Sequence, residues 1–265
     1  MIRHSFALFR TLLFPVLTLG WYLIYIGGLP LVRIRNKRFE TWRNQSMKLW
    51  GKSVLCLYNM KLQVEGPVPE PPFLHVSNHL SYMDIPVYSA VLETTFISKS
   101  EVRNWPLIGY MAHSLGIVFI DRRKKNDIHR VNEEITKQIN PWQGVLFFPE
   151  GTTSPGLGVM RFRNSLLDDS AQHGRGVTYS SIRYETTETD VPAYKSVCWW
   201  GGVHLLSHIY NAGKNRKVIV EVRFGSHPLV NRDRKMLGEE LQKAVENIFV
   251  PVAEKIPETF TPLQL

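Results

Sequence analysis

The run Pro72-Phe73-Leu74-His75-Val76-Ser77 leads directly into Asn78-His79-Leu80-Ser81-Tyr82-Met83-Asp84. The first run is short and largely apolar, which predicts a buried strand. In the second, a carboxylate follows five residues after His79, and a histidine oriented by a carboxylate is the general base of hydrolase triads. No G-x-S-x-G nucleophile motif occurs in the chain. We therefore expect the substrate itself to bring the hydroxyl group.

Short apolar runs alternate with helix-like segments along the rest of the chain. This alternation indicates an α/β fold with a mixed, largely parallel sheet flanked by helices. Ligands of such sheets bind beyond the carboxyl ends of the strands, so His79, Arg122 and Glu150 are expected to meet at one edge. The predicted strands are Lys61–Val64, Phe73–Val76, Thr95–Ile97, Gly116–Ile120, Val145–Phe148, Val177–Tyr184, Ser196–Cys198 and Val218–Phe224, and the predicted helices cover 39–58, 81–92, 104–113, 127–139, 164–173, 201–212 and 234–249.

Composition restricts the possible partners. The 265 residues are 44% hydrophobic and 21% charged, as in ordinary globular proteins. A net charge of +9 calls for an anionic partner, either a nucleic acid or a membrane surface. The two cysteines, Cys56 and Cys198, are far apart and provide neither a disulfide framework nor a zinc site.

The N-terminal segment favours the membrane. No charged residue occurs from Thr11 to Val32, a length that can cross a bilayer. Pro15 and Pro30 interrupt this segment, so a broken helix pair lying in one leaflet is an alternative to a straight transmembrane helix. A basic cluster at 33–38 follows and suits anionic headgroups on the cytoplasmic face. A cleaved signal peptide is disfavoured, because no small-residue cleavage site precedes that cluster.

We therefore predict a membrane-anchoring segment with a basic flank at residues 1–38 and a catalytic domain at residues 39–265. No nucleic-acid-binding signature is found, and we expect no nucleic-acid partner. His204 and His208 have helical spacing, but without a glutamate between them they do not form an H-E-x-x-H zinc motif. We expect no metal and no cofactor.

Three motifs carry the chemistry, and each also has a purely structural interpretation. Ser81 and Asp84 fit a helix start, which is compatible with Asp84 reaching back to His79. Asp121-Arg122-Arg123 ends an apolar run and suits a phosphate, although such a cluster is often only solvated charge. Phe148-Pro149-Glu150-Gly151-Thr152 is either a polar turn or a loop whose backbone N–H groups hold an anion or an oxyanion.

Together, in this order and spacing, the three motifs resemble the glycerolipid acyltransferase family typified by 1-acyl-sn-glycerol-3-phosphate acyltransferases. Its H-x4-D box matches His79 and Asp84, its G-x-x-F-I-D-R box matches 116–122, and its F-P-E-G-T box matches 148–152. The resemblance covers about residues 70–225. It implies that His79 is the base and Asp84 its partner. It also implies that the acceptor site contains Arg122, Glu150, Gly151 and Thr152.

Two departures leave the acceptor open. Thr153 stands where the third box often continues with arginine, and the strand at 177–182 lacks the proline of the fourth box. The resemblance implies transfer of an acyl group from acyl-CoA or acyl carrier protein to a lysophospholipid, with 1-acyl-sn-glycerol 3-phosphate as the expected acceptor. Glycerol 3-phosphate, a lyso-aminolipid and other lysophospholipids are alternatives. A non-catalytic membrane-surface protein is a further alternative, against which the intact H-x4-D pair argues.

Overall fold

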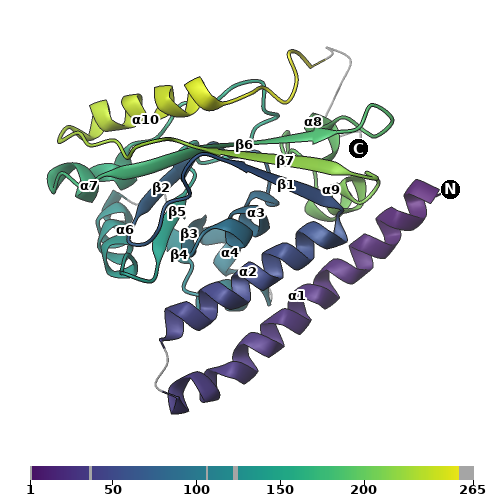
Figure 1. Cartoon of the computed structure of the whole chain (residues 1–265), viewed down its shortest axis with the longest axis horizontal. Helices are drawn as coiled ribbons and strands as arrows, with labels where there is room; N and C mark the ends of the chain where they lie inside the picture. Colours follow the sequence, from purple (N-terminus) through teal and green to yellow (C-terminus); the bar gives the residue numbers. More distant parts are fainter. Residues whose placement is uncertain (1, 36–37, 106, 122–124, 257–265) are drawn as a thin grey trace.

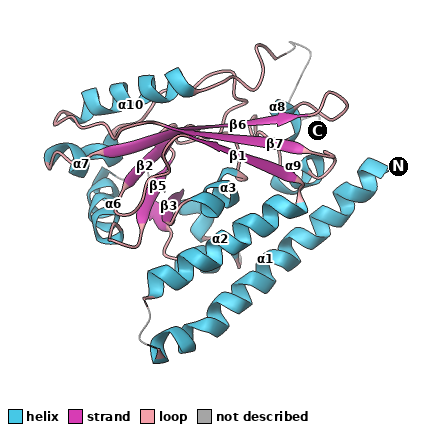
Figure 2. Cartoon of the chain, in the orientation of Figure 1, coloured by secondary structure: helices cyan, strands magenta, loops and turns pink. Residues whose placement is uncertain are grey.

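The computed structural model describes residues 2–35, 38–105, 107–121 and 125–256. A seven-stranded sheet lies between two groups of helices (Figures 1 and 2). The strands are β1 (Met60–Glu65), β2 (Leu74–Ser77), β3 (Thr94–Lys99), β4 (Val118–Ile120), β5 (Gly144–Phe147), β6 (Val177–Thr186) and β7 (Val218–Phe224). The helices are α1 (Ile2–Ile34), α2 (Phe39–Leu57), α3 (Asp84–Val91), α4 (Ser100–Arg103), α5 (Ile108–Ser114), α6 (Lys125–Gln138), η1 (Ser165–Leu167), α7 (Asp168–Gln172), α8 (Ala193–Ser196), α9 (Leu205–Ala212) and α10 (Arg234–Ile248).

The strand order is β1-β7-β6-β2-β5-β3-β4, and only the β6–β7 pair is antiparallel. The predicted mixed, largely parallel sheet is therefore confirmed. β2 is the central strand and pairs with β5 on one side and with β6 on the other. His79 lies in the loop that follows the carboxyl end of β2. This loop is therefore flanked by the end of β5 on one side and by β6 on the other.

Alternate residues of the central strands face two separate cores. Leu74, Val76, Val145 and Phe147 pack with α6 and α10 in one apolar cluster. The second cluster contains side chains of the opposite parity, among them Leu146, Phe148, Ile182 and Tyr184, together with residues of α2 and α3. This period of two is the expected pattern of strands buried on both faces. The second core lies beneath His79 and Asp84.

Helix α3 is held at its position by close packing on α2. A Cβ added at Gly51 of α2 would lie 2.4 Å from the carbonyl oxygen of Pro86, so only glycine allows the two backbones to approach this closely. Asp84 is the first residue of α3. The α2–α3 contact therefore fixes the height of the Asp84 carboxylate relative to the sheet.

Several predicted elements differ from the structure. The predicted strand at 196–198 is wrong: Pro192 begins a short helical turn, α8, and the N–H groups of Val197 and Cys198 both donate to the carbonyl of Ala193. The predicted helix at 104–113 begins too early: α4 ends at Arg103, and α5 starts only at Ile108, after Leu107 with φ +62°. The N-terminal segment is one continuous helix that contains Pro15 and Pro30, not a broken pair.

Candidate active site

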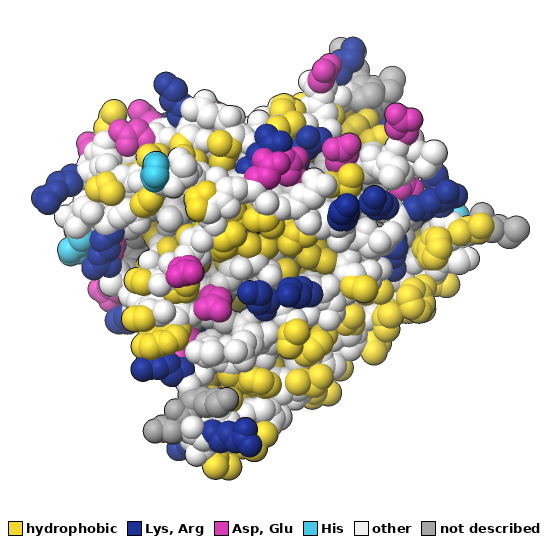
Figure 3. All heavy atoms as spheres, in the orientation of Figure 1, with side chains coloured by type: hydrophobic (Ala, Val, Ile, Leu, Met, Phe, Trp, Pro, Cys, Tyr) yellow, Lys and Arg dark blue, Asp and Glu magenta, His cyan; other side chains and the backbone are white. Residues whose placement is uncertain are grey.

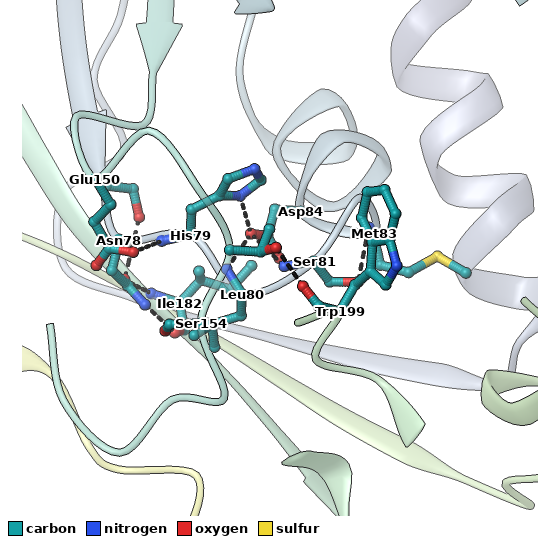
Figure 4. Close-up of polar contacts among 12 residues, drawn as sticks. Asn78, His79, Leu80, Ser81, Met83, Asp84, Glu150, Ser154, Ile182 and Trp199 are labelled. Carbon is teal, nitrogen blue, oxygen red and sulfur yellow. Dashed lines mark hydrogen bonds and ion pairs between the residues drawn. The ribbon is translucent and has the colours of Figure 1, made fainter. Parts of the chain in front are cut away.

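His79 lies in the loop after β2, where the chain turns into α3 (Figure 4). Its Nδ1 lies 2.7 Å from Oδ2 of Asp84. The carboxylate is fully buried, whereas the imidazole side chain is 19% exposed. Because Nδ1 donates to the carboxylate, the opposite nitrogen, Nε2, carries the lone pair that accepts a proton. The two residues thus have the arrangement of an oriented general base.

Asp84 accepts further hydrogen bonds that fix its direction. Its Oδ2 also accepts the N–H groups of Leu80, at 2.8 Å, and Ser81, at 3.1 Å. The Ser81 hydroxyl accepts the N–H of Met83 in return, at 3.3 Å. These reciprocal bonds have the form of a capping box, but they lie in the turn before α3, whose N-cap residue is Met83 and not the predicted Ser81. Oδ1 accepts the hydroxyl proton of Tyr184 at 2.6 Å.

The imidazole plane is fixed by the side chain of Phe148. The two rings are stacked, with centroids 3.9 Å apart and an interplanar angle of 7°. Phe148 follows β5, the neighbour of β2, so the parallel pairing of these strands brings the two rings together. The sequence identified Phe148 only as part of a motif; its stacking on His79 follows from the strand order.

Glu150 is positioned beneath the same loop and has backbone partners. One carboxylate oxygen accepts the N–H of His79 at 3.2 Å, and the other accepts the N–H of Met160 at 3.0 Å. Its side chain is only 3% exposed, and burial raises its pKa to about 8. In this geometry Glu150 joins the His79 loop to the loop around Met160. Its role in substrate binding stays a prediction.

The other predicted site residues are distributed around this centre. Gly151 has φ +74°, a conformation that favours glycine, and its N–H donates to the carbonyl of Phe148. Thr152 is exposed on the same loop. Asp121 follows β4, two strands away from β5, and Arg122 lies outside the described residues. The structure therefore brings together His79, Asp84, Glu150 and Gly151.

Two residues that sequence reasoning did not select complete the support of the loop. The amide of Asn78 donates to the carbonyl of Ile182 at 3.0 Å and accepts the Ile182 N–H at 2.8 Å, which extends the β2–β6 ladder by one side chain. The N–H of Trp199 donates to the carbonyl of Leu80 at 2.8 Å. Its indole contacts the ring of Tyr82 edge to face.

The remaining histidines near this edge have structural environments. His75 is fully buried, its ring nitrogens bond to the hydroxyls of Thr178 and Ser180, and burial lowers its pKa to about 3. His208 bonds to Tyr82 and to the carbonyl of Cys198. Within the described part of the chain, no cluster of three histidine, cysteine or acidic side chains is suited to a metal ion.

Comparison with known proteins agrees with this geometry. The family model described as Acyltransferase matches residues 60–182. A 1-acyl-sn-glycerol-3-phosphate acyltransferase of Neisseria gonorrhoeae is 31% identical over 80% of this chain and 84% of its own length. The chain belongs to the glycerolipid acyltransferase family. A lyso-ornithine lipid O-acyltransferase of Pseudomonas aeruginosa is also 31% identical, over 90% of this chain and 93% of its own length.

The fold of this acyltransferase is shared with a solved structure. The crystal structure of the 1-acyl-sn-glycerophosphate acyltransferase PlsC from Thermotoga maritima superimposes with a TM-score of 0.65 and 23% identity. The match covers 92% of this chain and 97% of the other.

We expect Glu150 to make stability depend on pH. Its raised pKa of about 8 means that the folded state favours the neutral acid. The contribution of the neutral Glu150 to the free energy of unfolding is fully present below the ordinary pKa of 4.5. It is lost as the pH rises toward 8, because the unfolded state then releases the proton more readily. Melting temperatures of wild type and Glu150→Gln, measured in detergent from pH 5 to 9, should therefore diverge in favour of the variant as the pH rises. The loss of one acceptor in the variant adds an offset that is independent of pH, and a constant difference would contradict the prediction.

Proposed function

We propose that the protein transfers an acyl group from a thioester, on CoA or acyl carrier protein, to the hydroxyl of a lysophospholipid, most specifically 1-acyl-sn-glycerol 3-phosphate. The observation that carries the proposal is the His79–Asp84 pair at 2.7 Å, with Nε2 on the side of the ring opposite the carboxylate. The family supports acyl transfer, and the relatives' acceptors support a lysolipid.

In the proposed reaction His79 Nε2 takes the proton of the acceptor hydroxyl as its oxygen attacks the thioester carbonyl. Asp84 stabilises the imidazolium that forms, and the stacked ring of Phe148 keeps the imidazole in its orientation. The tetrahedral intermediate then collapses, the carbon–sulfur bond breaks, and the leaving thiolate receives the proton from His79. Acid–base catalysis of this kind contributes about 10²- to 10⁴-fold in rate. The reaction forms no covalent enzyme intermediate.

A small cavity beside Phe148 suits the acceptor headgroup. It has a volume of about 110 Å³ and lies at the carboxyl ends of β4 and β5, where Arg163, Ser165, Pro149 and Ile120 contribute to its lining. Arg163 is exposed and, among the residues that the structure describes, has no ion-pair partner. We propose that it binds the anionic headgroup in place of the arginine that Thr153 replaces. Arg122 lies outside the described residues, and its role in binding the acceptor stays a prediction.

An apolar cavity of about 160 Å³ is suited to the acyl chain of a lipid substrate. It lies between α1, α2 and α5 and reaches Ile85, the residue after Asp84. Its lining includes Trp21, Trp50 and Met111. An acyl chain that enters from the membrane side would thus find an apolar environment next to the reacting groups.

A second acceptor is favoured by a specific observation. The lyso-ornithine lipid O-acyltransferase of Pseudomonas aeruginosa matches a larger share of this chain than the Neisseria relative does, at the same identity. A phosphate-free lyso-aminolipid would also be consistent with Thr153, which removes one cation from the third motif. We therefore keep lyso-ornithine lipid as the alternative acceptor.

The family and the N-terminal helix indicate membrane association, and the contacts of α1 bear on how this helix is oriented relative to the bilayer. α1 is long and apolar enough to cross a bilayer by length and composition. Along its whole length, however, α1 is hydrogen-bonded to the rest of the protein: Arg10 to the Gly213 carbonyl, Thr18 to Trp50, and Tyr25 to the Ser114 carbonyl. A transmembrane α1 would carry the polar face of α2, including the exposed Lys52, into hydrocarbon.

We therefore propose that α1 lies in one leaflet, parallel to the membrane plane, with the catalytic domain on the cytoplasmic face. Figure 3 shows hydrophobic side chains along the outer side of α1. The exposed large ones include Phe6, Leu8, Phe9, Leu12, Val16, Leu19, Leu23, Ile24, Ile26 and Leu31. Such an apolar face on a helix that is docked to a polar domain is typical of interfacial insertion.

His79→Ala is expected to lower kcat by about 10²-fold or more in vesicles that contain 1-acyl-sn-glycerol 3-phosphate, because the general base is lost. Thiol release from acyl-CoA measures the rate, and His227→Ala, at an exposed loop position, is the control. Near-normal turnover by His79→Ala would remove the basis of the proposed function.

Arg163→Ala should lower kcat/KM for 1-acyl-sn-glycerol 3-phosphate by about 10- to 100-fold, which is the value of a charge-assisted hydrogen bond. Lyso-ornithine lipid, which lacks phosphate, should be affected less. Arg122→Ala in the same assay tests its predicted role. If wild-type protein prefers lyso-ornithine lipid, the alternative acceptor is correct.

Single cysteines at Ser5 and Arg35 should react with a membrane-impermeant maleimide from the same side of sealed inverted vesicles. Both positions are exposed and lie near opposite ends of α1, and Cys56→Ser removes the exposed native thiol. A cysteine at His227 reports the side of the catalytic domain. Reaction of the two α1 positions from opposite sides would show that α1 spans the bilayer.

A further inference from the structure

A tyrosine from a distant strand contacts the His79–Asp84 pair. Tyr184 lies on β6, and its hydroxyl donates to Oδ1 of Asp84 at 2.6 Å. Both residues are fully buried. The other oxygen, Oδ2, is the one that bonds to His79 Nδ1. Tyr184 and His79 therefore hold the two oxygens of one carboxylate.

The fold places this hydroxyl with little freedom. Ser77, at the end of β2, is paired with Ser180 on β6. Asn78 then bonds to both backbone groups of Ile182, two residues before Tyr184 and on the same face of the strand. The backbone that carries His79 and the backbone that carries Tyr184 are thus tied together immediately beside the contact.

The environment also keeps Tyr184 in its donor form. Burial raises the pKa of Tyr184 well above its ordinary value of 10, so the phenol stays protonated through the neutral range. A buried carboxylate is costly unless its lone pairs accept hydrogen bonds. Without the hydroxyl, Oδ1 would lose the partner that Tyr184 provides, and the carboxylate would be held only through the bonds to Oδ2.

We propose that Tyr184 is a positioning residue of the acyl-transfer reaction. Its hydroxyl holds Asp84 in the orientation that keeps the His79 proton on Nδ1 and Nε2 available to the substrate. The hydrogen bond that this hydroxyl donates also stabilises the negative charge of the Asp84 carboxylate. The proposal rests on the proposed function of His79.

A second tyrosine provides a matched control. Tyr88 is also fully buried, and its hydroxyl bonds to the hydroxyls of Ser77 and Ser180, at 2.6 Å and 2.7 Å. Tyr88→Phe and Tyr184→Phe each remove one buried hydroxyl group. Only the second removes a hydrogen bond to Asp84.

Other titratable groups surround the pair, and apart from the substituted tyrosine of each variant they are the same in all the proteins compared. Glu150, with a pKa of about 8, accepts the His79 N–H, whereas Cys198 and Tyr88 interact with the Asp84 charge at longer range. Burial raises the pKa of Cys198 and of Tyr88, so both stay neutral. Glu150 titrates in every protein compared, and its contribution cancels in the differences.

The kinetic test uses full-length protein in vesicles. Tyr184→Phe should lower kcat about 10-fold, which is less than the rate factor lost when a general base is removed. The KM values for the acyl donor and for the acceptor should stay nearly unchanged. The acidic limb of the kcat profile should move to higher pH, because a less stabilised carboxylate favours the imidazolium. Tyr88→Phe should leave the profile in place and lower only the melting temperature. Identical profiles for the two variants and wild type would overturn the proposal.

The second test reads His79 directly and does not depend on activity. The imidazole ¹⁵N signals of labelled protein in nanodiscs are titrated, and the His79 signal is the one absent in His79→Gln. The His79 pKa should rise in Tyr184→Phe and fall when 3-fluorotyrosine, a stronger hydrogen-bond donor, replaces Tyr184. No shift in either protein would overturn the proposal. If His79→Ala retained activity while these shifts appeared, the proposed function would fail and the Tyr184–Asp84–His79 coupling would stand.

Discussion

The buried carboxylate of Asp84 is the group on which the rest of the site depends, because it has no access to solvent and must be stabilised by protein donors. Transfer of an unpaired carboxylate out of water costs at least several kcal/mol. Four donors offset this cost: the imidazole of His79, the N–H groups of Leu80 and Ser81, and the Tyr184 hydroxyl. Three come from the loop itself and one from β6. The charge therefore determines the fold of the loop and the orientation of the base at once.

The position of β2 in the sheet makes this arrangement possible. A central strand has a neighbour on each side, and both neighbours of β2 contribute to the environment of His79. On the β5 side, Phe148 stacks on the ring and Glu150 accepts the backbone N–H. On the β6 side, Tyr184 holds the partner carboxylate. An edge strand would leave the imidazole supported from one side only.

The sequence predicted the parts of the site that are local in the chain. The H-x4-D spacing placed Asp84 in the first turn of α3, within reach of His79, because five residues are enough for the chain to turn back. Tyr184 could not be found in this way, since it is 100 residues from Asp84 and its contact depends on the register between β2 and β6. The burial of Glu150 was missed for a related reason: a carboxylate in a glycine-containing loop looks exposed until its backbone partners are known.

The elements that were predicted wrongly are also those whose structure depends on tertiary contacts. An apolar triplet at 196–198 has a strand-like composition, but the turn begun at Pro192 directs it into α8 and the segment that supports Leu80. For α1 the two prolines left one helix and a broken pair as alternatives, and hydrogen bonds of Arg10, Thr18 and Tyr25 to three separate parts of the protein decide for one continuous helix. Intrinsic helix-breaking tendencies of a few kcal/mol are thus outweighed by packing along the whole length.

Rigid packing connects helix α1, which we propose contacts the membrane, to the reacting groups of the active site. α1 packs on α2, α2 packs on α3 at the contact that Gly51 permits, and α3 begins with Asp84. Side chains of these three helices also line the apolar cavity that reaches Ile85. If α1 lies in one leaflet, this chain of contacts fixes the distance between the membrane surface and His79. A lysolipid could then present its hydroxyl to Nε2 while its acyl chain stays in apolar surroundings, and the enzyme would need no nucleophile of its own because the bilayer delivers one at a defined height.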